Sequence, residues 1–472
     1  MSLSTLRPTF PPELLSEVVG HLVDLFPHNT RNGVEEMKKE MKKIATVSKS
    51  FLPIARAHLF KNITIPVAHI GLSPARVENL ANLLSQYPYI ERYVKSIVSN
   101  CCFMTDKAHD GRLLSLLNLP NVQTLTIGLH QCHHGKPTNS KDWYEGRSSD
   151  YFTHLGFRSI LEYYLYSGSL TTLKLQFISG VIPYHAILSS TSLDSLQLHC
   201  CDQPFFKSSD ESLLALSNSS SISKIRIRSS NIPFAVLVHC QNLQVLQFDQ
   251  DGSIDFRGQS ASQYNAICTP LFPSLKRLQI ILSACVYVGE KEDDDRQLNS
   301  LLDPSPSLNQ LTLLIPLERQ DLPLVPHLIS LESLTIKWSH HHSLYFSDFH
   351  RNILRSTVRT LSSLSLPSLK HLCLFLTLNP FVARPDEEQG LMDIATDGVL
   401  SLVQFFRSAS SSARLPSLQK VSIFLDIGRT VYFAPEERVW DSVGLDAKLT
   451  SLLDRLHDVE QTRFDFNVQV SQ

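Results

Sequence analysis

The sequence predicts an α/β protein in which a small helical unit is followed by an array of short parallel strands. Apolar residues recur at helical spacing over the first 65 residues, and a six-residue apolar pattern recurs along most of the remaining chain. The 472-residue length points the same way, because it exceeds one ordinary core and favours two domains or a repeat array. We therefore expect a helical domain at residues 1–65 and a repeat domain at residues 66–472.

The first expected helix lies in the stretch TFPPELLSEVVGHLVDL, at residues 9–25. Pro11 and Pro12 suit a first helical turn, where the missing N–H of proline leaves nothing unpaired. So small a unit cannot bury a broad apolar stripe on all sides unaided, so the stripe predicts contact with another protein. Its members recur at helical spacing and are Leu14, Leu15, Val18, Val19, Leu22 and Leu25.

Two more helices and one strand are expected before residue 65. The segment VEEMKKEMKKIATVSKSF, at residues 34–51, follows the polar break PHNTRNG. In it Glu36 and Glu40 precede Lys39 and Lys43 by three residues, a spacing that stabilises helices. A short helix over Leu52–Phe60 then leads into a strand-like NITI at Asn62–Ile65.

The repeated pattern reads apolar, two residues, apolar, one residue, apolar, and we number its residues as positions 1 to 6. One copy forms one short strand that cannot bury its apolar side chains alone, so stacked copies share a continuous core. Pro or Ser commonly precedes a copy, as in Pro273-Ser274 and Pro416-Ser417. The copies begin at Val122, Leu170, Leu193, Ile222, Leu243, Leu275, Leu308, Leu331, Leu369 and Leu418.

The shorter intervals between copies fall in or near the range of about 20–29 residues that is typical of leucine-rich repeats, and the longer ones require insertions. We expect an irregular leucine-rich repeat solenoid, with parallel strands on the concave face and helices and loops on the outer face. Polar stretches such as residues 131–150 and 285–297 are expected to be surface loops. The asparagine or cysteine that usually follows each repeat strand is mostly missing, and Cys201 is the clearest fit.

Two N-terminal segments together resemble an F-box domain, especially the F-box-like version found in large basidiomycete fungal families. They are FPPELLSEVVGHL, at residues 10–22, and TVSKSFLPIARAHLFKNITI, at residues 46–65. The resemblance implies a substrate-recognition subunit of a Skp–cullin–F-box E3 ubiquitin ligase. The helical unit would bind a Skp-type adaptor, and through it a cullin, while the repeats hold a client protein. The alternative is a leucine-rich repeat interaction scaffold that belongs to no ligase.

The residues expected at the adaptor surface lie on the first and third helices. Leu22, Phe51, Leu59 and Phe60 fit an internal core equally well. The full set is Pro11, Pro12, Leu14, Leu15, Val18, Val19, Leu22, Phe51, Leu59 and Phe60.

A second predicted surface lies on the repeat strands, where residues between and just after the apolar positions face outward. At these outward positions Asp249 is the acidic residue we find. Phe375 and Phe424 occupy similar positions and fit either an exposed apolar patch or the core. Such a face suits an acidic or phosphorylated client segment, because Arg clusters pair with phosphate. Alternatively, exposed strand positions simply tolerate basic residues. Its basic members are Lys174, Lys224, Arg226, Arg228, Arg277, Lys337 and Lys420.

The composition and motifs argue against several function classes. The net charge of -2 lacks the basic excess typical of nucleic-acid binding, and no run approaches the roughly 18 apolar residues of a membrane span. We expect no secretory signal, so the 9 cysteines predict reduced thiols in the cytoplasm or nucleus. No phosphate-binding loop, nucleophile elbow or metal-ligand spacing occurs, so we expect no enzyme, cofactor or metal. The histidine runs at 133–134 and 340–342 are expected in solvated segments.

Overall fold

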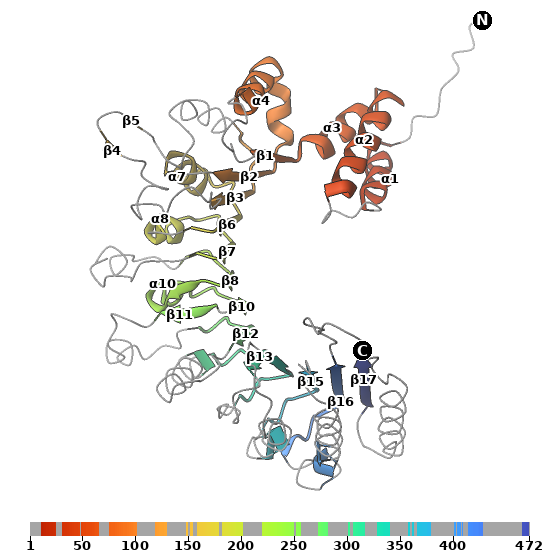
Figure 1. The fold of residues 1–472 in the computed structure, drawn as a ribbon, viewed down its shortest axis with the longest axis vertical. Helices are drawn as coiled ribbons and strands as arrows, with labels where there is room; N and C mark the ends of the chain where they lie inside the picture. Colours follow the sequence, from red (N-terminus) through yellow and green to blue (C-terminus); the bar gives the residue numbers. More distant parts are fainter. Residues whose placement is uncertain are drawn as a thin grey trace, which may run out of the picture. The chain divides into compact units, whose positions relative to one another are not determined.

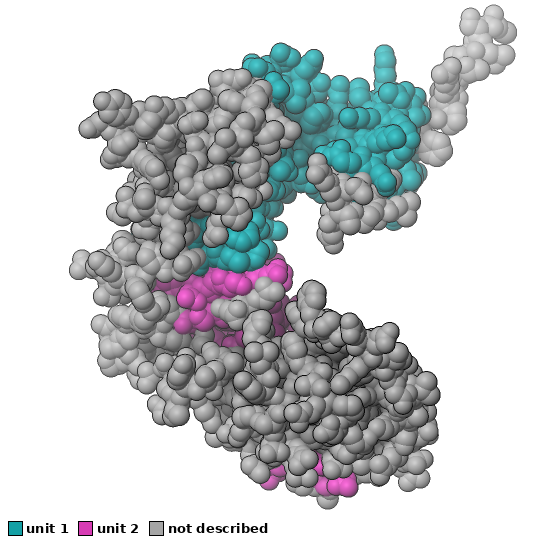
Figure 2. Space-filling model, in the orientation of Figure 1, with its two compact units in different colours: residues 1–205 teal, residues 206–472 magenta. Residues whose placement is uncertain are grey.

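The fold is that of a computed structural model in which the chain divides into two compact units, Met1–Phe205 and Phe206–Gln472 (Figure 2). We call them unit 1 and unit 2. The structure describes residues 11–24, 31–47, 49–65, 75–101, 119–129, 148–149, 152–153, 158–178, 182–201, 220–249, 252–255, 272–281, 301–302, 305–316, 328–339, 357–358, 361–362, 366–378, 401–402, 404–406, 408, 414–427 and 465–471.

Unit 1 begins with three helices, α1 (Pro12–Asp24), α2 (Arg31–Val47) and α3 (Phe51–Phe60). All three were predicted, but α2 begins within the expected polar break, because its first turn carries no apolar residue to mark it. On α2, Lys43 lies against Glu40 as predicted, and Lys38 pairs with Glu35 at 3.1 Å. These exposed pairs are three residues apart and each contributes only a few tenths of a kcal/mol, about 0.2–0.5.

The three helices share a small apolar core. Val19 and Val23 lie one turn apart on α1 and pack with Met41 of α2, and all three are buried. Partly buried side chains of α2 and α3 surround this cluster: Met37, Ile44, Phe51, Ile54 and Leu59. One face of α1 is therefore buried in the core of the three helices.

The rest of unit 1 is a parallel sheet whose strands follow chain order (Figure 1). Helices α7 and α8 lie on one side of these strands (Figure 1). The strands are β1 (Asn62–Ile65), β2 (Ser96–Cys101), β3 (Thr124–Leu129), β6 (Thr172–Gln176) and β7 (Ser195–His199). Between them lie α4 (Ala75–Gln86), η1 (Pro88–Tyr93), an antiparallel pair β4 (Ser148–Ser149) and β5 (Phe152–Thr153), α7 (Arg158–Tyr166) and α8 (Tyr184–Leu188).

Unit 2 repeats this arrangement with a second set of parallel strands in chain order. They are β8 (Lys224–Arg228), β10 (Val245–Asp249), β12 (Arg277–Ile281), β13 (Gln310–Pro316), β14 (Ser333–Ser339), β15 (His371–Leu378), β16 (Lys420–Ile427) and β17 (Asp465–Ser471). A small parallel pair, β9 (Asn231–Pro233) with β11 (Ser253–Asp255), and helix α10 (Phe234–Val238) lie beside β8 and β10 in sequence.

Every predicted copy of the pattern forms a strand, and the copies stack in register. Position 4 pairs with position 4, as in Leu246 with Leu278 and Leu278 with Leu311. Positions 1, 4 and 6 are buried, and the residues between them are mostly half-buried or exposed, as on β8; Thr126 and Ser422 at position 5 are buried exceptions. The alternation confirms that one face of each strand is core and the other faces outward.

Recurrent backbone contacts hold the copies at this register. The carbonyl at position 2 accepts hydrogen bonds from the N–H groups of positions 2 and 3 of the next copy. For example, the Gln244 carbonyl oxygen accepts from the backbone nitrogens of Lys276 and Arg277 at 2.9 and 3.0 Å. A turn precedes many copies: the N–H of Leu418 donates to the carbonyl of Leu415 across Pro416-Ser417 at 3.2 Å. Proline suits the second place of such a turn, which explains the Pro-Ser that comes before the strands.

The sequence pattern missed β2 and β17, because each lacks one apolar position, and the short strands β4, β5, β9 and β11 were not predicted either. In β2 the place of the third apolar residue is taken by Ser99, which is nevertheless buried. For β17, counting back along the sequence from the register with β16 places the first apolar position at Arg463, before the strand begins. Their pairing with β3 and β16 shows that neighbouring strands supply the register when the local pattern is incomplete.

Candidate protein-interaction surfaces

The exposed face of α1 is apolar. Leu14, Val18 and Leu22 are 49%, 54% and 39% exposed. They follow one another at intervals of four, so they form one stripe along the helix. The stripe lies about a third of a turn around α1 from Val19 and Val23, which fill the core. An amphipathic helix would normally place charged residues on this outer face.

The structure divides the predicted adaptor residues into two groups. Leu14, Val18 and Leu22 lie outside, joined by the exposed Pro11 and the half-buried Leu15. Val19 is a correction: it is wholly buried against Met41, because it lies about a third of a turn away from the exposed stripe.

The predicted residues of α3 belong mainly to the interior. Phe51 and Leu59 pack against the core cluster, and Phe60 is partly buried where α3 ends. Sequence reasoning missed Val47, which is 70% exposed at the end of α2.

The helical part of unit 1 continues into its sheet with a single residue between them. Lys61 follows α3 directly, and its carbonyl accepts the N–H groups of Lys95 and Ser96 at 2.9 and 3.0 Å. This is the position-2 contact of the repeats, so Phe60–Ile65 is itself a copy of the pattern, with apolar residues at positions 1, 4 and 6. The guanidinium of Arg56 on α3 also lies 4.6 Å from the ring centre of Tyr89 on η1.

The outward face of the unit 2 strands carries most of the predicted basic residues. Lys224, Arg226 and Arg228 are exposed on β8, and Arg277, Lys337 and Lys420 are exposed on later strands. Lys174 lies on β6 of unit 1 and is half-buried. The alternation of the strands therefore puts six of the seven predicted residues on one face of one unit.

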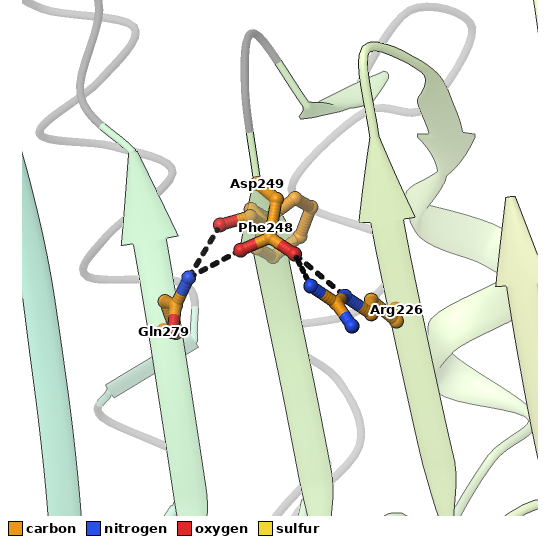
Figure 3. A network of polar contacts seen from close by, with 4 residues as sticks. All are labelled: Arg226, Phe248, Asp249 and Gln279. Atoms are coloured by element: carbon orange, nitrogen blue, oxygen red, sulfur yellow. Dashed lines mark hydrogen bonds and ion pairs between the residues drawn. The ribbon is translucent and has the colours of Figure 1, made fainter. Parts of the chain in front are cut away.

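Arg226 is already neutralised by a carboxylate. Its Nε donates to Oδ2 of Asp249 at 2.6 Å, and its Nη2 lies 2.5 Å from the same oxygen (Figure 3). Gln279 holds the other side of Asp249, donating from Nε2 to Oδ1 at 2.5 Å and to the carbonyl of Phe248 at 3.2 Å. The three side chains come from β8, β10 and β12, so Asp249, the acidic residue expected on this face, pairs with one of the predicted basic residues.

Phe375 and Phe424 form an aromatic stack on the outward face. Their ring centres are 4.4 Å apart and the planes differ by 7°. Both rings are half-buried, while the neighbouring Leu374 and Ile423 are buried in the core on the other side of the sheet. The rings therefore form a surface patch and not core.

A lysine completes one end of this stack. Lys337 Nζ lies 5.0 Å from the ring centre of Phe375, a cation–π contact. Burial raises the pKa of the nearby Cys373 thiol, and the positive charges of Lys337 and Lys420 oppose that rise. Both lysines thus act electrostatically on the same point of β15.

The described cysteines read as structural. Cys201 is buried and its Sγ donates to the carbonyl of Leu175 on the preceding strand at 3.4 Å, which agrees with its place after the repeat strand. Cys240 is also buried, and burial raises the pKa of its thiol to about 12. Among the described residues, no group of histidine, cysteine, aspartate or glutamate could hold a metal ion. The histidine runs at 133–134 and 340–342 and the predicted loop at 285–297 lie outside the described residues. Of the predicted loop at 131–150, the described residues Ser148–Ser149 form strand β4.

Comparison with known proteins gives no assignment. No family model matches the chain, and no curated protein matches it. Within the part of the chain that the structure describes, no helix has the length and apolar character needed to cross a bilayer. The geometry of the two surfaces is therefore what bears on function.

Proposed function

We propose that this protein is the substrate receptor of a Skp–cullin–F-box ubiquitin ligase. In this role α1 binds a Skp-type adaptor, which connects to a cullin, and the repeat strands hold the client. The chain itself carries out no chemistry. It raises the concentration of the client near a ubiquitin-conjugating enzyme held by the other subunits.

The observation that carries the proposal is the exposed stripe of Leu14, Val18 and Leu22. Burying a Leu or Val side chain fully is worth about 1.5–3 kcal/mol, so covering three half-exposed ones contributes several kcal/mol. The stripe lies within the segment that resembles an F-box, whose helices pack on the adaptor. Its other face is already occupied by the core, so the helix can bind a partner without unfolding.

The direct connection between α3 and β1 also supports the proposal. A tether raises effective concentration most when its length and direction are fixed. Here the hydrogen bonds of Lys61 with Lys95 and Ser96 join the helices to the first two strands without a flexible linker. An adaptor bound on α1 would therefore be held in a fixed relation to the strands of unit 1.

Co-expression with a Skp-type adaptor tests this function. Wild-type chain should co-purify with the adaptor, and Leu14→Asp with Val18→Asp should abolish co-purification, because an unpaired carboxylate is costly to bury. Ser16→Asp is the matched control, since it adds charge at an exposed position on another side of α1. Unchanged helical circular dichroism would show that the variants fold.

Two results would overturn the assignment. Retention of the adaptor by the double variant would show that the stripe is not the contact. Failure of the folded wild-type chain to bind adaptor would leave the alternative function, a repeat scaffold that belongs to no ligase.

A further inference from the structure

Three adjacent strands of unit 2 align a row of side chains at position 7, the residue just after the pattern. Lys337 of β14 pairs in register with Phe375 of β15, which pairs with Phe424 of β16. Neighbouring strands lie about 4.8 Å apart, so side chains at the same register touch. The cation–π contact and the ring stack confirm that they do.

The row is fixed before any ligand arrives. The rings pack on each other at 4.4 Å and Lys337 is held over the open face of Phe375. Their strands are fixed from behind by Ile336, Leu374 and Ile423, all buried. A ligand therefore loses little by ordering these side chains, which favours affinity.

Lys420 lies on the same face as the row. It is exposed and precedes Phe424 on β16 by four residues, or about 13 Å along an extended strand. We call Lys337, Phe375, Phe424 and Lys420 the aromatic–lysine surface. The stacked rings thus have one ammonium group beside Phe375 and a second one further along β16 from Phe424.

The charges around this surface favour an acidic partner. Lys337, Lys420 and the exposed Arg277 form no ion pair with the described residues. Two carboxylates of this region have their own cations, since Asp249 pairs with Arg226 and Glu332 pairs with Lys370 at 2.7 Å. Two more carboxylates belong to this region in the backbone register, since Asp465 stands beside Lys420 and Asp426 follows Phe424 by two residues. Counted with Lys337, Lys420 and Arg277, they leave an excess of one positive charge.

We propose that the aromatic–lysine surface binds an acidic segment of the client in which carboxylates flank a bulky apolar side chain. The apolar side chain packs on the stacked rings, and the carboxylates meet the two ammonium groups. Lysine ammonium groups pair with carboxylate and with phosphate alike, so the test below compares a carboxylate peptide with a phosphoserine peptide. This step rests on the proposed function only in naming the bound protein a client.

Arg226 does not serve as the anchor. A ligand carboxylate there would have to displace Asp249, which Gln279 also holds. Binding is therefore expected at β14–β16 and not at β8, although β8 carries more basic residues.

Fluorescence anisotropy with labelled peptides tests the surface on the full-length chain. The probe is a short peptide with a central Phe and Glu residues on both sides. The comparison peptides replace Phe by Ser, replace each Glu by Lys, or replace two Glu by phosphoserine. We expect the Glu–Phe peptide to bind, and the Ser and Lys peptides to bind about tenfold more weakly or worse.

Variants of the chain locate the site. Lys337→Glu with Lys420→Glu, and separately Phe375→Ser with Phe424→Ser, should each weaken the Glu–Phe peptide about tenfold. Lys276→Glu is the matched control, because this exposed lysine precedes β12 and lies outside the surface. Bound peptide should also slow alkylation of Cys373, because this thiol is close enough to Lys337 and Lys420 for both charges to affect its pKa.

Several outcomes would overturn the proposal. These are no binding of the Glu–Phe peptide, equal loss with Lys276→Glu, or tighter binding of the phosphoserine peptide that survives the Lys337 and Lys420 changes. Adaptor co-purification is read separately through α1. Peptide binding by a chain that does not bind the adaptor would contradict the ligase role alone. Adaptor binding by a chain that does not bind the peptide would contradict the proposed surface alone.

Discussion

The backbone N–H of Ser96 donates to the carbonyl oxygen of Lys61 at 3.0 Å, so the residue that follows α3 also begins the ladder of the sheet. The same contact recurs between later copies, for example from Arg277 to Gln244. The helical part of unit 1 is thus joined to the strands by the same hydrogen bonds that join one repeat to the next. Its stability should depend on this contact.

Replacing Ser96 by proline tests that dependence. Ser96→Pro removes the donor and puts proline into a strand paired on both sides, which costs about 3 kcal/mol or more. We expect a lower urea midpoint and faster hydrogen exchange of α3 amides. Ser96→Ala keeps the N–H and should change both little. Equal protection of α3 in the two variants would show that the helices are held independently of β2.

The network of Arg226, Asp249 and Gln279 predicts a measurable but small coupling. The Arg226 side chain is largely exposed, and exposed pairs contribute about 0.2–1 kcal/mol. A double-mutant cycle of Arg226→Ala and Asp249→Asn should give a coupling in this range that shrinks as salt is added. Arg277→Ala with Asp249→Asn serves as the unpaired cycle. A coupling that did not respond to salt would contradict a screened surface pair.

This network also marks what the sequence could and could not predict. Periodicity placed Arg226 and Asp249 on the outward face, because alternate residues of a strand face the same way. It could not bring them together, since the intervals between copies vary and the register comes from position-2 hydrogen bonds. The misplacement of Val19 at the adaptor surface has a similar reason. Helical spacing predicted an apolar helix but not which of its sides would pack into the core. The sequence therefore predicted which residues share a face but not which of them pair.

The two faces of β16 predict opposite sensitivities for adjacent residues. Ile423 is buried in the core, and truncating such a residue to alanine costs about 2–5 kcal/mol. Phe424 is half-buried on the outward face, so Phe424→Ala should cost clearly less although it removes more atoms. Chemical denaturation of the two variants gives the comparison. A larger loss for Phe424→Ala would mean that the stack is core after all.

The thiols of Cys240 and Cys373 should differ in reactivity because only the thiolate is alkylated. Burial raises the pKa of Cys240 to about 12, so at mildly alkaline pH its native thiol should react only on unfolding. Cys373 is half-buried, and the charges of Lys337 and Lys420 keep its pKa below the value that burial alone would give. It should therefore react faster than Cys240 in the folded chain. Lys337→Ala removes one of these charges, raises the Cys373 pKa and should slow alkylation, whereas Lys276→Ala should not. Peptide-level mass spectrometry distinguishes the two sites, and an unchanged Cys373 rate in Lys337→Ala would show that the ammonium group does not act there.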